Sequence, residues 1–425
     1  MKNAVVLIII CFFFWGCNPV SQLDCNLFNN TSSDNREIID YKTVKENLIQ
    51  QTVESMSLKS KIAQMLLISV DGNCLSNSIS LYTGEYSPGG FLLFKFNVDS
   101  SEYKKIKSFN DLLKNTYTSI NQIAPYIAID HEGGDVNRLK KVLPDLPSQE
   151  YIASCFSLSD AKSMYYYHSK MLEKLGININ LAPITEIKTD ENHEFLVNRS
   201  FGDSKKVFEY VNAALWGIER TSVLPVQKHF PGNTNEDTHT GRAVINSNMD
   251  VIRDLYIAPF KDVRNINNSA VMMSHTVLNA VDSNPSCISK ETVKLFKDST
   301  GFSGLLFTDD LTMDALSKSG FPLKKAMVAA IDAGVDVIML SITNYIRIVD
   351  SIIGEIEGNE ELVKKIDMAV KKIINWKIDS GLIGIDLFSE VPSLSFDIKY
   401  ECSEGEERSF DAYHDMAEAL LQRYR

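Results

Sequence analysis

The stretch "VLPVQKHF", from Val223 to Phe230, begins as an almost continuous apolar run and ends in two titratable side chains, Lys228 and His229. Such a run is typical of a strand that is buried on both faces of a parallel sheet. Before it, Asp203 and Ser204 precede apolar residues spaced three and four positions apart, which predicts a capped amphipathic helix. A helix followed by a buried strand indicates the alternating architecture of α/β proteins.

Seven further apolar runs of similar length recur along the chain. They are Met65–Ser69, Gly90–Phe96, Tyr126–Asp130, Ile177–Pro183, Ala270–His275, Gly304–Asp310 and Val335–Ser341. Helical patterns fill Ser159–Leu175 and Lys324–Ala333, and similar patterns lie between most of the other strands. Eight strands that alternate with helices predict an α/β fold, a (β/α)8 TIM barrel with a single catalytic domain. A doubly wound open sheet is the alternative.

The barrel prediction demands that active groups lie where the strands end, on the carboxyl-terminal face. The expected strands end in Asp130, in Lys228 and His229, in Ser274 and His275, and in Asp309 and Asp310. Strands must meet solvent somewhere, and this alone places some polar residues at their ends. Contact with solvent does not require that lysine, histidine and aspartate side chains all converge on one rim. We therefore expect an active site there.

The composition of the 425-residue chain is that of a globular protein. Apolar residues make up 44% and charged residues 23%, and the formal net charge is −12. Binding to phosphate backbones needs clustered Lys and Arg, and the chain has no basic block, which argues against a nucleic-acid partner. The cysteines beyond the N-terminal region are scattered without a C-x-x-C pair, which argues against a zinc site.

The N-terminal residues have the pattern of an export signal. Lys2 is followed by the apolar run Ala4–Trp15, which is too short to span a bilayer comfortably. The run ends in Gly16 and Cys17, which resemble the lipobox of bacterial lipoproteins. That resemblance implies lipidation of Cys17 and an exported, membrane-anchored protein of the cell envelope. An ordinary signal peptide that is cut nearby is the alternative.

These observations predict four regions. A lipoprotein-type signal peptide covers residues 1–17, and a polar, Asn- and Ser-rich tether covers residues 18–45. The (β/α)8 domain covers residues 46–385, and a C-terminal extension covers residues 386–425.

Four stretches carry a family resemblance. They are "IAIDHEGGDVNRL", "LAPITEI" followed by "NRSFG", "KHFPGNTNEDTH", and "GFSGLLFTDDLTM". In order and spacing they resemble glycoside hydrolase family 3, and within it the bacterial single-domain β-N-acetylglucosaminidases, over roughly Ser57–Gly384. The resemblance implies a retaining, exo-acting enzyme that removes terminal β-linked N-acetylhexosamine.

Retaining glycosidases need a carboxylate that attacks the anomeric carbon and a proton donor for the leaving oxygen. The resemblance assigns the nucleophile to Asp309 and the acid/base pair to Asp237 and His239. Histidine titrates near neutral pH, so it needs little adjustment to exchange protons there. The resemblance also implies a set of sugar-binding residues: Asp130, Arg138, Arg199, Lys228 and His229. For His229 and Arg138 a structural role, the latter in an ion pair, is the alternative.

The chain departs from the family pattern in two places. The family usually continues "KHFPGHGxxxxDSH", whereas this chain reads "KHFPGNTNEDTH" and has a shorter loop. About 40 residues follow Gly384, too few for the α/β sandwich domain that donates a Glu acid in many family members. The second departure agrees with a loop histidine as the acid.

Other classes of function remain open from sequence. A metal-dependent barrel hydrolase also uses His and Asp at strand ends, but the histidines here are not spaced for one metal. A catalytically impaired, sugar-binding surface lipoprotein is a second alternative, and a β-glucosidase or phosphorolytic variant is a third. We expect no metal or other cofactor, a monomeric chain, and an N-acetylglucosamine-containing glycan or muropeptide as substrate.

Overall fold

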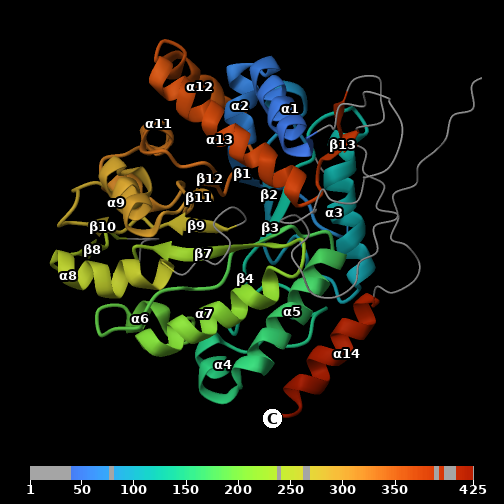
Figure 1. Cartoon of the computed structure of the whole chain (residues 1–425), viewed down its shortest axis with the longest axis vertical. Coiled ribbons are helices and arrows are strands. Elements are labelled where there is room, and N and C mark those ends of the chain that lie inside the picture. The colour runs from blue at the N-terminus through green and yellow to red at the C-terminus, as the bar shows by residue number, and fades with distance from the viewer. Residues whose placement is uncertain are drawn as a thin grey trace, which may run out of the picture. The chain divides into compact units, whose positions relative to one another are not determined.

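Eight short parallel strands form the centre of the computed structural model (Figure 1). They are β1 (Leu66–Ser69), β2 (Gly90–Leu93), β3 (Tyr126–Ile129), β6 (Ile179–Asn180), β7 (Leu224–Phe230), β9 (Ala270–Met273), β11 (Leu305–Thr308) and β12 (Ile338–Leu340). Each strand pairs with the next along the chain, and β12 also pairs with β1. A parallel bridge between Phe307 and Val337 joins β11 to β12 and closes the circle. The predicted (β/α)8 barrel is therefore confirmed, and an open doubly wound sheet is excluded.

The structure describes residues 40–75, 81–236, 241–261, 269–386, 392–396 and 408–424. Every residue of the eight barrel strands is buried, as expected of strands that are covered on both faces. Among the described residues, no helix combines the length and apolar character that crossing a bilayer requires. Cys17, with the rest of the expected signal and most of the tether, lies outside the described residues.

Helices surround the strands in Figure 1. They are α1 (Tyr41–Ser55), α2 (Leu58–Gln64), α3 (Tyr103–Thr118), α4 (Gln149–Cys155), α5 (Leu158–Lys174), α6 (His193–Leu196), α7 (Ser204–Ile218), α8 (Met249–Val251), α9 (Lys290–Thr300), α10 (Asp314–Lys318), α11 (Leu323–Ala333), α12 (Ile346–Ile356), α13 (Glu360–Asp379) and α14 (Phe410–Leu421). Short 3-10 or π turns are η1 (Gly84–Tyr86), η2 (Ile252–Ile257), η3 (Ala258–Phe260) and η5 (Ser286–Ile288). Between β1 and β2 the described residues form only η1.

The helix expected before β7 forms as the sequence predicts. The side chain of Asp203 accepts a hydrogen bond from the backbone N–H of Lys206 and caps α7. One face of α7 is buried, including Val207, Val211 and Leu215. Because these positions are three or four residues apart, they lie together on the side of the helix that packs inward.

Small strand pairs and the chain's last helix complete the domain. The pairs are β4 (His131–Gly133) with β5 (Val136–Asn137), β8 (Val244–Ile245) with β10 (Val277–Leu278), and β13 (Gly384–Asp386) with β14 (Ser393–Ser395). Helix α14, within the expected C-terminal extension, packs against α5. After it, Tyr424 stacks on Phe156 with ring centroids 3.9 Å apart. At the other end, α1 begins at Tyr41, inside the segment that we assigned to the tether.

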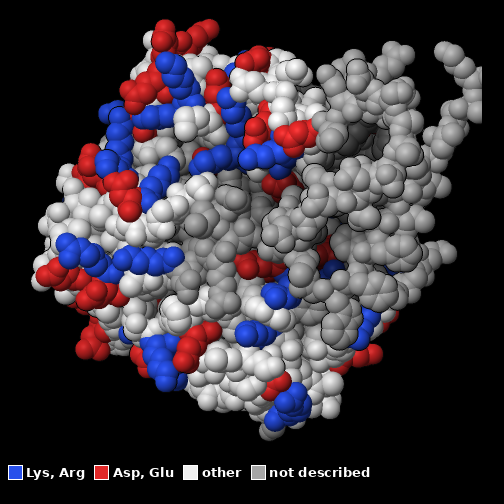
Figure 2. Space-filling view, in the orientation of Figure 1, with Lys and Arg blue, Asp and Glu red and all other residues white. Residues whose placement is uncertain are grey.

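The face shown in Figure 2 carries acidic and basic side chains interspersed among uncharged ones. Blue side chains are most frequent in the upper left of this view, where red side chains lie among them.

Candidate active site

The polar residues expected at the strand ends gather on one face of the barrel. Asp130 follows β3 directly, and Asp309 follows β11 directly. Lys228 and His229 lie near the end of β7, just before its last residue, Phe230. Parallel strands point the same way, so their carboxyl ends form one rim. The sheet order places β7 between β6 and β9, and β9 beside β11.

Lys228 joins two of the carboxylates on this rim. Its Nζ donates to Oδ1 of Asp130 at 2.7 Å and lies 2.8 Å from Oε1 of Glu132. The guanidinium of Arg199 donates from Nε and one Nη to the two oxygens of Glu132, both at 2.9 Å. Glu132 is therefore a buried carboxylate held between two cations, which is a structural role. It forms ion pairs with both Lys228 and Arg199.

The charges of this cluster keep its members ionised. Burial raises the pKa of Glu132, but the charges of Lys228 and Arg199 outweigh burial and the pKa lies well below its usual range. Burial lowers the pKa of Lys228, whereas the carboxylates of Asp130 and Glu132 raise it, and the net shift is upward. Lys228 is thus a permanent, almost completely buried cation that orients Asp130.

Arg138 reaches the same carboxylate from the β4–β5 side. Its Nη2 lies 3.7 Å from Oδ2 of Asp130, which is an ion-pair distance and too long for a hydrogen bond. Its Nε is buried without a hydrogen-bond partner among the described residues. The two oxygens of Asp130 therefore face different cations.

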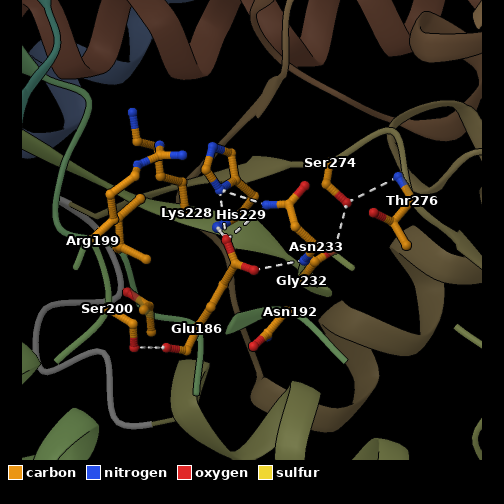
Figure 3. Close-up of polar contacts among 12 residues, drawn as sticks. Glu186, Asn192, Arg199, Ser200, Lys228, His229, Gly232, Asn233, Ser274 and Thr276 are labelled. Carbon is orange, nitrogen blue, oxygen red and sulfur yellow. Dashed lines mark hydrogen bonds and ion pairs between the residues drawn. The ribbon is translucent and has the colours of Figure 1, made fainter. Parts of the chain in front are cut away.

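A second buried carboxylate, Glu186, holds His229 (Figure 3). Oε1 of Glu186 accepts a hydrogen bond from Nδ1 of His229 at 2.7 Å. The backbone N–H of Asn233 donates to Oε2 at 2.6 Å, and its side-chain amide donates to Oε1 at 2.9 Å. Burial raises the pKa of Glu186, but these hydrogen bonds and the nearby His229 produce a net lowering. An ionised Glu186 fixes the Nδ1–H tautomer of His229 and leaves Nε2 for another partner.

The loop after β7 turns back over Glu186 at Gly232. This glycine has φ +150, and an added Cβ would lie 3.2 Å from a ring carbon of Tyr256. The hydroxyl of Ser274 donates to the carbonyl of Gly232 at 3.2 Å, as Figure 3 shows. The turn therefore brings Asn233 onto Glu186 and anchors the start of the loop.

Asp309 and Asp310 have different surroundings. Oδ1 of Asp309 accepts from the backbone N–H of Asp310 at 2.8 Å, and no other described residue donates to this carboxylate. In contrast, Oδ1 of Asp310 accepts from Thr312 N, Thr312 Oγ1 and Ser341 N at 2.9, 2.7 and 3.1 Å. Three hydrogen bonds thus hold Asp310 in place, whereas a single one from the described residues reaches Asp309.

The ionisation of Asp309 depends on histidines at the ends of the neighbouring strands. Burial raises its pKa, but His275 and then His229 lower it, and the net shift is downward. Nε2 of His275 lies 2.8 Å from the backbone carbonyl oxygen of Asp310, and Nδ1 of His275 lies 3.2 Å from Sγ of Cys287. With the Cys287 thiol as donor to Nδ1, the ring donates from Nε2 and braces the turn that carries Asp309.

Asp237 and His239 lie outside the described residues. The stem that leads to them is described and is anchored. The backbone N–H of Asn235 donates to the carbonyl of Glu191 at 2.6 Å, and its side chain donates to the carbonyl of Asp190 at 3.0 Å. The stem is therefore fixed to the segment between β6 and α6.

The family model described as "Glycosyl hydrolase family 3 N terminal domain" matches residues 57–376, well over half of the chain. The chain belongs to glycosyl hydrolase family 3. It is a glycoside hydrolase.

Relatives of this family 3 hydrolase align with most of the chain. Beta-hexosaminidase LpqI of Mycobacterium tuberculosis is 25% identical over 333 residues, which cover 76% of this chain and 83% of the relative. The solved structure of LpqI matches with a TM-score of 0.68 at 23% identity, over 78% of this chain and 96% of that one. A family 3 β-N-acetylglucosaminidase from Paenibacillus sp. matches with a TM-score of 0.72 at 23% identity, over 87% and 69% of the two chains.

The sequence analysis of this family 3 hydrolase missed two residues of the site, Glu186 and Asn233. Glu186 belongs to the quoted "LAPITEI" stretch but lies beyond the strand end, and nothing in its local pattern places it against His229. Asn233 stands where the family pattern has a second histidine, and it contributes two of the hydrogen bonds to Glu186. Among the described residues of the hydrolase, no group of three or more His, Cys, Asp or Glu has an arrangement that could hold a metal ion.

Proposed function

We propose that the chain is a retaining, exo-acting β-N-acetylglucosaminidase with Asp309 as its nucleophile. One observation carries the proposal: Asp309 stands at the carboxyl end of β11 with a lowered pKa and with a carboxylate oxygen that no described residue engages. A nucleophile needs both a negative charge and an unengaged lone pair. Asp310 differs in that three donors act on its Oδ1, which ties this side chain to Thr312 and Ser341.

The reaction proceeds in two displacements. The carboxylate of Asp309 bonds to the anomeric carbon while His239 donates a proton to the leaving oxygen, and the glycosidic bond breaks. Water then attacks the glycosyl-enzyme, His239 accepts the proton of this water, and the bond to Asp309 breaks with retention. Asp237 orients the histidine ring and stabilises its charged form, as a carboxylate does in hydrolytic triads.

The terminal sugar binds against Asp130, Lys228 and His229. Asp130 offers carboxylate oxygens to sugar hydroxyls, and a hydrogen bond from Lys228 holds it in place. His229 presents Nε2, because its Nδ1–H is committed to Glu186. Arg138 and Arg199 complete the polar wall. Preference for the acetamido sugar is supported by the β-hexosaminidase names of the relatives.

A rate comparison tests this function. The purified full chain should hydrolyse aryl N-acetyl-β-glucosaminide at least about tenfold faster than aryl β-glucoside, as judged by kcat/KM, a preference of roughly 1.4 kcal/mol. Equal rates, or a faster reaction with the glucoside, would remove the acetamido assignment. The absence of turnover on both substrates would instead favour the impaired sugar-binding alternative. Repeating the assay with inorganic phosphate, and identifying the product, separates hydrolysis from phosphorolysis.

We also propose that the hydrolase acts at the cell envelope, where it is anchored through Cys17. The apolar run that ends in Gly16 and Cys17 supports this location, and peptidoglycan fragments that contain N-acetylglucosamine are substrates available there. Cys17→Ser should release the protein from the membrane fraction or block its processing. Wild type that never incorporates a labelled fatty acid would point to ordinary secretion.

A further inference from the structure

The turn η5 bonds to both residues that flank His275 in the chain. The backbone N–H of Cys287 donates to the carbonyl of Ser274 at 3.0 Å. The hydroxyl of Ser286 donates to the carbonyl of Thr276 at 2.6 Å. All of these side chains are buried, and that of Cys287 is completely so. The hydrogen bonds therefore fix the place of the Cys287 thiol relative to the His275 ring.

The contacts of the His275 ring are met by one neutral tautomer. Nε2 lies 2.8 Å from the carbonyl oxygen of Asp310, which can only accept, so the ring proton belongs on Nε2. Nδ1 is then an acceptor, and the thiol of Cys287, with Sγ 3.2 Å away, is its donor. Burial, and after it the carboxylate of Asp309, raise the pKa of this thiol well above its usual range. The thiol therefore keeps the proton that the hydrogen bond needs.

A short series of hydrogen bonds leads from the thiol to the proposed nucleophile. The His275 ring holds the carbonyl of Asp310, and the N–H of Asp310 donates to Oδ1 of Asp309 at 2.8 Å. Without a donor at Nδ1, a neutral ring would bury an unsatisfied acceptor, which costs free energy. Rotation of the ring toward another donor would take its Nε2–H away from the Asp310 carbonyl. The turn that carries Asp309 would then lose the support of His275.

We propose that Cys287 is a positioning residue: its thiol donates to Nδ1 of His275 and holds the ring in the orientation that braces the Asp309 turn. The inference rests on the proposed glycosidase function and adds a completely buried residue that touches neither the sugar nor the reacting carbon. A buried cysteine can also serve as a small apolar core residue, and that role would need only its volume. The proposed role needs a hydrogen on the sulfur as well, so substitutions that separate volume from donor capacity distinguish the two.

Steady-state kinetics of two variants make this separation, because serine and alanine both reduce the volume but only serine keeps a donor. Cys287→Ala should lower kcat on the aryl N-acetyl-β-glucosaminide about tenfold. It should leave KM within about twofold of wild type, since no proposed sugar-binding residue belongs to β9 or β11. Cys287→Ser should retain kcat within about threefold of wild type. Cys74→Ala removes another buried thiol, which follows β1, and is the matched control that should change neither constant.

NMR of the histidine ring nitrogens reads the hydrogen bond independently of catalysis. In the full chain labelled with nitrogen-15 histidine, the signals that His275→Gln removes belong to His275. At neutral pH, Nδ1 of this ring should be unprotonated in wild type and in Cys287→Ser. Its resonance should move toward that of an unbonded ring nitrogen in Cys287→Ala and should stay in place in Cys74→Ala.

The outcomes separate this inference from the function on which it rests. Equal losses in Cys287→Ser and Cys287→Ala, no loss in Cys287→Ala, or a loss carried by KM overturns the positioning role while the glycosidase function stands. A protonated Nδ1 in wild type overturns it too, and that measurement needs no variant of Cys287 to fold. If wild type cleaves no substrate, the proposed function fails, and NMR judges the brace alone. A shifted Nδ1 resonance in Cys287→Ala then supports the brace, whereas an unchanged one overturns it.

Discussion

Glu186 accepts a hydrogen bond of 2.7 Å from Nδ1 of His229, and both side chains are almost completely buried. The contact sets the ring orientation of a histidine that we propose to contact the sugar. The same carboxylate accepts two hydrogen bonds from Asn233, at the start of the loop that leads to the proposed acid/base pair. Glu186 thus couples the wall of the sugar site to the loop that follows it.

Replacing Glu186 by Gln should weaken catalysis through His229. The amide nitrogen of Gln would face at least one of the present donors, and a charge-assisted hydrogen bond is worth about 1.5–3 kcal/mol. We expect kcat/KM on the aryl N-acetylglucosaminide to fall roughly 10- to 100-fold, together with weaker inhibition by N-acetylglucosamine. Glu150→Gln, which alters a partly exposed ion pair with Lys188, is the control. A lower melting temperature without any change in kinetics would make Glu186 purely structural.

Asp309 and Asp310 should respond differently to the same substitution. Asp309→Asn removes the nucleophile, so kcat should fall by at least about a thousandfold, roughly 4 kcal/mol, on every substrate. Asp310→Asn keeps an amide oxygen that still accepts from Thr312 and Ser341, so it should retain most of the activity. Steady-state kinetics of the two variants side by side give the answer. Comparable losses in both would mean that the nucleophile is misassigned.

His239→Ala should affect substrates according to their leaving groups. An aryl oxide leaves without much help from a proton, whereas a sugar alkoxide needs protonation to leave. The variant should therefore keep more of the rate of glycosyl-enzyme formation with the aryl glycoside than with a disaccharide. Water attack on the glycosyl-enzyme should be slow with both, because the same histidine is the base. A covalent adduct on Asp309 should therefore accumulate and appear in the intact mass. Equal losses on both substrates and no adduct would direct the search for the acid/base to His275.

The buried pair His131 and His168 should make the fold sensitive to mild acid. Their rings lie in contact, with Nε2 of His131 3.0 Å from Nδ1 of His168. Burial lowers the pKa of His131 to about 4, and burial followed by the charges of His131 and His414 lowers that of His168 well below its usual value. Unfolded histidine titrates near 6.5, so between about pH 6.5 and 4 the unfolded chain binds protons that the folded chain rejects. Stability is then complete above this window and falls as the pH drops through it.

Urea unfolding at pH 7.0 and pH 5.0 measures this effect. His131 alone contributes on the order of 3 kcal/mol across the full window. The acidic residues with lowered pKa, such as Glu186, lose their stabilising contribution only at lower pH, so they do not obscure the comparison. His168→Asn should reduce the pH dependence of the unfolding free energy, while the exposed His193→Asn should not. A dependence that is identical in wild type and His168→Asn would contradict the assignment.

The sequence predicted the barrel well because strand burial and helix amphipathicity are local patterns. The predicted length of β2 was too great, because the strand ends at Leu93 although the apolar run continues to Phe96. There the side chain of Asn97 accepts from the backbone N–H of Phe94 at 2.8 Å and closes a turn. Phe94 and Phe96 therefore follow the strand and line a surface cleft together with residues that follow β1 and β12, a placement that periodicity cannot reveal.

The candidate site was predictable at its rim and much less so beneath it. Family motifs named Asp130, Lys228 and Asp309, and the structure places all three where parallel strands end. The sequence analysis had nothing local to connect Glu186 with His229, which lie 43 positions apart and meet only through the pairing of β6 with β7. Second-layer carboxylates of this kind depend on tertiary packing, which a single sequence does not display.

The closure of the barrel between β11 and β12 has a mechanical consequence. Four residue pairs join β11 to β9, whereas a single bridge joins it to β12. Hydrogen bonds nevertheless span the closure. Asp336 accepts from the N–H of Leu306, Thr308 accepts from that of Met339, and the N–H of Leu311 donates to the carbonyl of Met339 at 3.0 Å. The turn that carries Asp309 is therefore clamped to β12 as well as to β9, so the last junction to close the barrel also fixes the proposed nucleophile from both sides.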